Sequence, residues 1–460
     1  MRNSYLYITL LAMLGFSAET QAQEAVQQPK LVVSICIDGL NSNGLENYTT
    51  IYGTGGLRLL MQEGLLFTHA TFNFSPVDIA SAAAAIATGA PPYYNGITGR
   101  EWLNRETLRP ERMIADSQHG CSPQQLATST LGDELKMATE GRAKIYAFAP
   151  TAEAAILSAG HAANGAAWIE RAEWVTSSYY QPADQWLRHF VSRYIPGADE
   201  NMGVAQAALD CIDQNSIGSD DDADLMCLTM HTGNRTDDYV KLDYALSYLI
   251  SGITQKIPLD KVLFVMAGTG KHEEDEDERR TNQARYRIPT GKYYINRTVN
   301  LLNMYLGAVY GNAQYVETCY QNQIFLNRQL IDKKGLNISD ILTRSKEFIL
   351  QLSGVRNVYT ASQLINSDSQ LLQRIRNGFN QEHCGDLLIE VAPGWELINE
   401  DMHTSQITHM AVLPLPIIFY GSHVKSQRVA TPVTTDRIAP TIARCIRIRA
   451  PNACQAEPLF

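Results

Sequence analysis

Short apolar runs alternate along the chain with longer amphipathic segments. The runs are rich in β-branched and aliphatic residues and have the length of buried strands. They cover residues 31–37, 65–71, 144–148, 225–229, 261–267, 387–391 and 416–420. Apolar strands separated by helices are typical of parallel sheets that are covered on both faces. The pattern therefore predicts an α/β fold with a doubly wound, largely parallel sheet.

Helical periodicity is present in residues 55–63, 123–139 and 237–252. Ser122 is expected to cap the second of these helices, with Pro123 at its first position. Residues from about 282 to 400 are too many for a single crossover connection. We expect an inserted cap subdomain there, within one domain that covers residues 23–460.

Residues 1–22 have the features of a secretory signal peptide. Arg2 precedes an apolar stretch, and Thr20-Gln21-Ala22 supplies a small residue before the expected cut. The apolar stretch is too short for a stable transmembrane helix, and no later segment reaches that length. We therefore expect an exported protein, periplasmic or extracellular, without an integral membrane anchor.

The formal net charge is −10, and no basic patch is present to neutralise nucleic acid phosphates. This balance argues against nucleic acid as a partner. The eight cysteines permit disulfides in an oxidising compartment, but sequence does not fix their pairing. Cys211–Cys227 and Cys445–Cys454 are the candidate pairs closest in sequence, whereas Cys36, in its apolar strand, favours a free thiol.

Candidate chemistry gathers where two of the predicted strands end. The run 31–37 ends on Asp38-Gly39, and the run 65–71 leads into a helix expected at residues 79–88. Asp78 directly precedes that helix. It is either its N-cap, which we favour because Asp is a preferred capping residue, or a carboxylate nucleophile.

Motifs in a fixed order along the mature chain carry a resemblance to a known family. They are Asp38-Gly39, Gly55-Gly56-Leu57, Asn73-Phe74-Ser75-Pro76, Thr88-Gly89, Gly96–Trp102, Ala159–Ala166, Arg287–Gly291, Ala392–Trp395 and Ile417–Gly421. In these features the chain resembles the alkaline phosphatase superfamily. The nearest members are the phosphate-irrepressible alkaline phosphatases and the nucleotide pyrophosphatase/phosphodiesterases. The resemblance implies the alkaline phosphatase-like fold and hydrolysis of phosphate esters with two zinc ions and a Thr or Ser nucleophile.

Matching the family's functional positions to this chain leaves most of them without the expected chemistry. Asp38 matches the first metal-binding aspartate, and the nucleophile position holds Ile79. The other zinc-ligand positions fall on Met230, Asn234, Gly268, Thr269 and Pro414, and the phosphate-binding positions fall on Arg100, Thr151 and Glu153. Isoleucine has no lone pair with which to attack phosphorus, and a lone aspartate gives little affinity for zinc. Glu153 is expected to repel a phosphate.

We therefore expect no catalytic residue and no cofactor, with Asp38 as the only surviving metal ligand. The favoured function is an exported pseudophosphatase, a non-catalytic binding or scaffold protein with an unidentified protein or small-molecule partner. One alternative is a hydrolase of phosphate mono- or diesters with a rebuilt, zinc-dependent site. Such a site would regroup His231, His272, His403 and His409 with Asp38 and Asp401. A second alternative is a structural component of the cell envelope.

Overall fold

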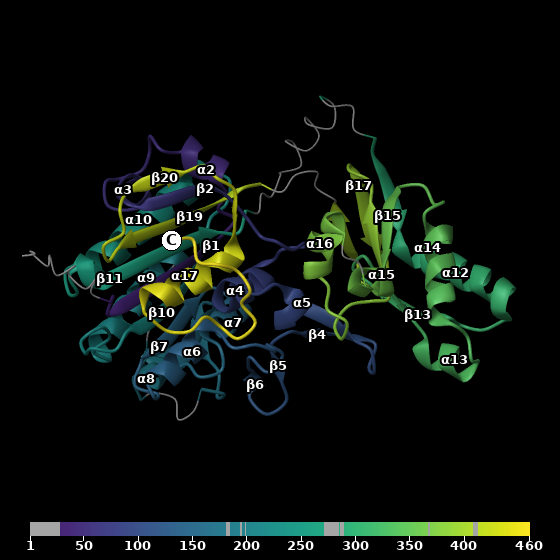
Figure 1. The fold of residues 1–460 in the computed structure, drawn as a ribbon, viewed down its shortest axis with the longest axis horizontal. Helices are drawn as coiled ribbons and strands as arrows, with labels where there is room; N and C mark the ends of the chain where they lie inside the picture. Colours follow the sequence, from purple (N-terminus) through teal and green to yellow (C-terminus); the bar gives the residue numbers. More distant parts are fainter. Residues whose placement is uncertain are drawn as a thin grey trace, which may run out of the picture.

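The computed structural model describes residues 28–180, 185–193, 196–197, 199–270, 285, 289–366, 369–407 and 413–460. The expected signal peptide, residues 1–22, lies outside this range. A ten-stranded sheet in the order β20-β2-β19-β11-β1-β10-β7-β8-β9, with β21 beside β2, forms the centre of the fold (Figure 1). Its strands are β1 (Leu31–Asp38), β2 (Leu65–Thr71), β7 (Ile145–Ala149), β8 (Gly165–Glu170), β9 (Glu173–Thr176), β10 (Asp224–His231), β11 (Val262–Gly268), β19 (Leu415–Gly421), β20 (Gln427–Val429) and β21 (Val433–Thr434).

Most neighbouring strands of this sheet are parallel. β1 pairs in parallel with both β10 and β11, and β7 pairs in parallel with β10 and β8. Only β19, which is antiparallel to β11 and β2, and the β8–β9 hairpin depart from this direction in the described part of the sheet. The predicted doubly wound, largely parallel sheet is confirmed.

Side chains alternate along the strands and build a separate apolar core on each face of the sheet. In β1, Val32 and Cys36 belong to one core, and Leu31 and Val33 belong to the other. The first core is covered by α4 (Ile79–Thr88), α6 (Leu131–Ala138), α7 (Ala152–Ala159) and α17 (Ile438–Cys445). The second is covered by α2 (Ser42–Asn47), α3 (Leu57–Glu63), α8 (Gln185–Arg193), α9 (Glu200–Gln214) and α10 (Thr236–Thr254).

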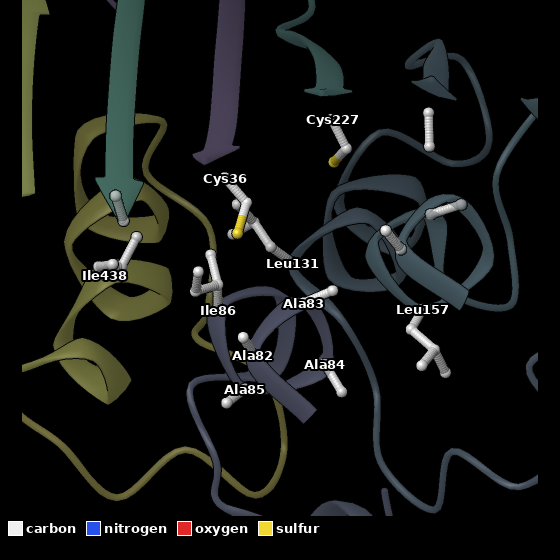
Figure 2. Packing of buried hydrophobic residues seen from close by; sticks show 14 of the residues in the cluster. Cys36, Ala82, Ala83, Ala84, Ala85, Ile86, Leu131, Leu157, Cys227 and Ile438 are labelled. Carbon is white, nitrogen blue, oxygen red and sulfur yellow. The ribbon is translucent and has the colours of Figure 1, made fainter. Parts of the chain in front are cut away.

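Helix α4 is the most deeply buried helix of the first face. Its run Ala82–Ala85 has at most 2% of any side chain exposed, because small side chains let α4 pack closely against its neighbours. Figure 2 shows α4 between α7 and α17, with Cys36 and Cys227 on the same side of the sheet. The position of this helix is therefore fixed on several sides, which also fixes its first residue.

Residues 291–407 form two smaller sheets and their helices between β11 and β19. One sheet has the order β12 (Gly291–Tyr294), β17 (Trp395–Asn399), β18 (Thr404–Ile407); the other has the order β13 (Val316–Tyr320), β14 (Gln323–Leu326), β16 (Leu387–Val391), β15 (Val355–Thr360). The helices are α12 (Ile295–Tyr310), α13 (Arg328–Lys333), α14 (Ile338–Ile349), α15 (Ala361–Asn366) and α16 (Gln370–Asn377). The predicted run 387–391 is thus a strand, but of a small sheet. The limits of a subdomain at about 282–400 stay a prediction.

A segment with α5 (Pro92–Asn95) and two short hairpins links α4 to α6. The hairpins are β3 (Glu101–Asn104) with β4 (Arg109–Arg112), and β5 (Ala115–Asp116) with β6 (Gly120–Cys121). The helix expected from Pro123 begins only at Leu131, and its cap is Thr130 rather than Ser122. The upstream residues are held elsewhere, because the Ala127 amide donates to the Asn95 carbonyl at 2.9 Å.

The cysteines lie within the described residues, and all eight are free thiols. Cys211 and Cys227 belong to the cores on opposite faces of the sheet, so the first candidate disulfide is wrong. Cys445 and Cys454 are also unbonded, whereas the free thiol expected for Cys36 is confirmed. Burial raises the pKa of Cys384 to about 11. Among the described residues, we find no helix long and apolar enough to cross a bilayer.

Candidate functional site

A cavity of about 630 Å³ lies where β1 and β10 end and α4 begins. In a parallel sheet, this carboxyl edge is where ligands usually bind. The lining residues are Asp38, Gly39, Ile79, Arg100, Pro150, Thr151, Glu200, Thr229, Met230, His231, Thr232, Gly233, Asn234, Arg235 and Asp238. We call this cavity the cleft. It brings together Asp38, Ile79 and Arg100, which the sequence analysis singled out from separate segments.

Asp38, the last residue of β1, is held by a neighbouring hydroxyl. Thr269 Oγ1 donates to Asp38 Oδ1 at 2.9 Å and accepts a hydrogen bond from the Gly39 amide at 3.0 Å. Thr269 directly follows β11, the strand next to β1. A neutral donor therefore occupies one carboxylate oxygen at the position where the resemblance places a metal ligand.

Ile79 is the first residue of α4, and its side chain is 7% exposed. The preceding Asp78 is the N-cap of the helix, as favoured from the sequence. Asp78 Oδ1 accepts hydrogen bonds from the amide and the hydroxyl of Ser81, each at 2.9 Å. Its Oδ2 accepts from the Arg100 amide at 2.8 Å. Both oxygens thus have structural partners, and the capping interpretation is confirmed.

Glu153, expected to repel a phosphate, is neutralised by a residue that the sequence analysis did not single out. Arg112 donates from Nε and Nη2 to Glu153 Oε1 at 2.9 and 2.8 Å. Burial works against the charge on Arg112, but the hydrogen bond and charge of Glu153 raise the pKa of Arg112 above its ordinary value. Glu153 is 5% exposed. The expected repulsion is therefore wrong, because this carboxylate is paired.

Arg100 also lines the cleft. Among the described residues it has no ion-pair partner, whereas Arg235 pairs with Asp238 at 3.3 Å. Thr151, at the other phosphate-binding position, is the N-cap of α7. Arg100 is thus the cation of the cleft that is available to an anion.

Three of the remaining ligand positions of the resemblance contact core or backbone, whereas Asn234 lines the cleft. Met230 is fully buried in the core that faces α10. The Pro414 carbonyl accepts from the Ser42 amide at 2.8 Å. A Cβ added to Gly268 would lie 2.2 Å from the Leu40 carbonyl oxygen, which itself accepts from the Gly270 amide at 2.9 Å. An aspartate at 268 therefore requires a backbone shift.

Of the four histidines proposed to regroup around a metal, the structure describes His231 and His403, and the cleft does not bring these two together. His231 lines the cleft, with Nδ1 at 3.7 Å from Glu200 Oε2. His403 and Asp401 do not line it, and His272 and His409 lie outside the described residues. Glu200 begins α9, far from the other cleft residues in sequence, and no local pattern pointed to it.

The described residues do not fit the pair of zinc ions that the resemblance implies. Zinc sites in proteins use several His, Cys or carboxylate ligands held in fixed orientations. Within the described ranges, no group of three or more His, Cys, Asp or Glu side chains is arranged to hold a metal ion. Asp38 shares its oxygen with Thr269, and Gly268 leaves no room for a carboxylate.

Comparisons with known proteins show similarity to a family named for phosphodiesterases and nucleotide pyrophosphatases and to alkaline phosphatases. A family model described as type I phosphodiesterase / nucleotide pyrophosphatase matches residues 32–412. Alkaline phosphatase PafA of Elizabethkingia meningoseptica is 22% identical over 98% of each chain. Alkaline phosphatase PhoV of Synechococcus elongatus is 22% identical, also over 98% of each chain. The crystal structure of PafA superposes with a TM-score of 0.81 at 20% identity, over 95% of this chain and 99% of that one, which supports the fold.

These relatives overturn one expectation from the sequence. The relatives are alkaline phosphatases, which depend on zinc, so the comparisons contradict the expectation of no cofactor. Zinc is the cofactor that the family implies. The error arose because the loss of ligands at matched positions was taken as the loss of metal from the whole protein.

Proposed function

Because the chain belongs to the type I phosphodiesterase / nucleotide pyrophosphatase family, we propose that its cleft binds a phosphate ester and that residue 79 does not attack the phosphorus atom of that ester. One observation carries this proposal: Ile79, which has no nucleophilic atom, occupies the first turn of α4 at the floor of the cleft. A hydrolase of this family needs a nucleophile at that position, as the resemblance implies. The proposed protein is thus an exported binding member of a hydrolase family.

Arg100 supports binding of an anion. The residue lines the cleft, and its guanidinium has no ion-pair partner among the described residues. The resemblance implies a neutral asparagine at this position that holds a phosphate oxygen. A guanidinium binds phosphate through paired, charge-assisted hydrogen bonds, which are stronger than the hydrogen bonds of a neutral amide. The ion pair with Arg112 neutralises the repulsion that Glu153, which lies outside the cleft, would exert on this ligand.

Titration calorimetry with inorganic phosphate and adenosine monophosphate tests the binding. We expect Arg100→Ala to weaken binding by about tenfold, as for loss of a charged hydrogen bond. Arg109→Ala is the matched control, because Arg109 is an exposed arginine of the same hairpin region that does not line the cleft. Equal affinities of the wild type and Arg100→Ala would overturn the proposal.

Hydrolysis at a rebuilt, metal-dependent site is the second candidate. The names of the relatives favour it, and His231, Glu200 and Asp38 line the same cavity. Its test is release of 4-nitrophenol from 4-nitrophenyl phosphate and bis(4-nitrophenyl) phosphate, with and without added Zn²⁺, alongside elemental analysis of the purified protein. Turnover that His231→Ala abolishes would favour this candidate over binding alone.

Export and a macromolecular partner are further parts of the proposal. The signal-like residues 1–22 support export, and cleavage after Ala22 would appear in the mass of the mature protein. The net charge of −10 supports a partner other than nucleic acid. A scaffold role would require a protein that co-purifies with the chain in stoichiometric amount.

A further inference from the structure

A second cavity, of about 380 Å³, lies at the opposite end of α4 from the cleft. Three parts of the chain form it: the segments on either side of α4, helix α16, and residues near the C-terminus. Figure 1 shows α16 beside α5 where the central sheet and the smaller sheets meet. No residue lines both this cavity, which we call the junction cavity, and the cleft.

Amide and hydroxyl side chains dominate the wall of the junction cavity. They are Asn73, Tyr94, Ser369, Gln370, Gln373, Asn377 and Gln455, beside Asp436 and Arg376. An amide offers both donors and an acceptor, and a hydroxyl does the same. A ligand that matches such a wall also carries many groups that donate and accept at once. The volume of the junction cavity lies in the range of cavities that hold small molecules.

The polar wall is built into the fold rather than being a chance set of surface side chains. Asn73 Nδ2 donates to Asp436 Oδ2 at 2.7 Å, which fixes the carboxylate. Asn377 Nδ2 donates to the Asn73 carbonyl at 3.0 Å, which fixes the end of α16. The guanidinium of Arg376 lies over the Tyr93 ring at 5.2 Å from its centroid. Side chains from two regions about 300 residues apart therefore hold the wall together.

One acceptor in this wall has no donor. Asp436 Oδ1 is buried and has no hydrogen-bond partner among the described residues. Burial raises the pKa of Asp436 above its ordinary value. A buried acceptor without a donor is costly. Oδ1 itself has almost no accessible surface, but Asp436 lines the cavity. An anionic ligand would meet this carboxylate with like charge, whereas a hydroxyl group would donate to it.

We propose that the junction cavity is a binding site for a neutral polyhydroxylated ligand, a saccharide of one or two sugar units. A sugar hydroxyl donates to the carboxylate of Asp436, which lines the cavity. The amides of Gln373 on α16 and Gln455 near the C-terminus bind further hydroxyls from two sides. Free sugars and the ends of longer glycans share this chemistry. The site does not depend on phosphate binding in the cleft.

Saturation-transfer NMR on the full chain tests the site with D-glucose, D-galactose, N-acetyl-D-glucosamine and chitotriose. We expect transfer to the ring protons of at least one of these probes. Removing two neutral hydrogen bonds in Gln373→Ala/Gln455→Ala should weaken that binding by about tenfold or more. Both residues are exposed, so the variant should fold. Stronger binding of chitotriose than of its monosaccharide would identify a glycan end as the source, and equal binding a free sugar.

Two further variants keep the test specific to this cavity. Gln373→Trp fills the mouth of the cavity and should abolish the transfer. Gln351→Ala removes an exposed glutamine that does not line the cavity, and should leave the transfer unchanged. Absence of transfer for every probe would overturn the proposal, and so would wild-type transfer in both Gln373 variants. Arg100→Ala should keep the sugar signal, which separates this site from the cleft.

Discussion

The cavities at the two ends of α4 differ in how far their polar side chains are already hydrogen-bonded to other groups of the protein. At the N-terminal end, several carboxylates in and beside the cleft already accept hydrogen bonds. Thr269 donates to Asp38, Ser81 donates to Asp78, and Arg112 donates to Glu153. Arg100 is the arginine of the cleft without an ion-pair partner among the described residues. At the C-terminal end, the junction cavity has a wall of amides and an acceptor without a donor. A cavity whose groups are mutually paired is stable when empty, whereas one with unmatched groups gains from a ligand.

The comparison also shows that a cavity can keep its place in the family's fold while the side chains that line it change. The cleft lies where the resemblance places the family's substrate site, yet Ile79 and Gly268, at two of the family's functional positions, lack the family's chemistry. The junction cavity has no counterpart among the positions matched to the family, yet its side chains suit a ligand. Fold similarity places the first region and says nothing about the second.

The largest effect is expected for Gly268→Asp, which restores the family's residue type. The added Cβ would lie 2.2 Å from the Leu40 carbonyl oxygen, a backbone atom that cannot move aside cheaply. We expect a loss of more than about 3 kcal/mol in the free energy of unfolding by urea denaturation. The control is Gly307→Asp on α12, where the nearest atom is 3.9 Å away and a loss below about 1 kcal/mol is expected. Equal stability of Gly268→Asp and the wild type would show that the Leu40 carbonyl oxygen leaves room for a side chain at residue 268.

Ile79→Ala should also be strongly destabilising. The side chain is 7% exposed and belongs to the core between the sheet and α4. Truncating a buried isoleucine costs about 2–5 kcal/mol. The matched control is Ile51→Ala, because Ile51 is 37% exposed and should cost about 0.5 kcal/mol. A negligible loss for Ile79→Ala would show that residue 79 does not serve packing and would reopen a functional role for it.

Arg112→Met tests whether the pairing of Glu153 matters for stability. The variant leaves a buried carboxylate without its cation. A fully buried pair would cost about 3–5 kcal/mol to break, but the Arg112 side chain is 45% exposed, so we expect about 2 kcal/mol. Arg112→Met/Glu153→Gln should recover much of this loss in the same urea denaturation. If the double variant is no more stable than the single one, the charge of Glu153 is not the cause.

Local sequence patterns predicted the strand end and the helix start beside the cleft, but not the contacts that their side chains make. Asp38 at a strand end and Asp78 before a helix follow from periodicity and capping rules, which act over a few residues. The Thr269–Asp38 hydrogen bond joins positions 231 apart in sequence, so no local pattern could reveal it. Arg112 lies on a short hairpin with no motif, and for this reason the charge of Glu153 was misjudged.

The start of α6 was predicted too early along the chain for a similar reason. Ser122 and Pro123 satisfy the local rules for a helix N-terminus, but tertiary hydrogen bonds hold the next residues in a turn. The Leu126 carbonyl lies 3.1 Å from His161 Nε2, and Ala127 donates to Asn95. Thr130 and Asp133 then provide a capping box, at which the helix begins. Where two start signals compete, long-range contacts decide between them.

The smallest effect concerns the unmatched acceptor of the junction cavity. Because the folded-state pKa of Asp436 is above its ordinary value of 3.8, the folded state binds the proton more tightly than the unfolded chain does. The stability of the protein therefore falls as pH rises from 3.8 through the folded pKa, and the full penalty remains at neutral pH. Asp436→Asn removes this penalty and can keep an oxygen facing Asn73.

We expect Asp436→Asn to raise the melting temperature at pH 7 and to leave it unchanged at pH 3.5, as measured by circular dichroism at both pH values. Asp332→Asn is the control, because Asp332 is an exposed aspartate of α13 that does not line the cavity. A lower melting temperature for Asp436→Asn at pH 7 would show that the carboxylate is satisfied without a ligand. The polar groups at both ends of α4 would then be satisfied without a ligand, and the case for a sugar hydroxyl at the Asp436 carboxylate would fail.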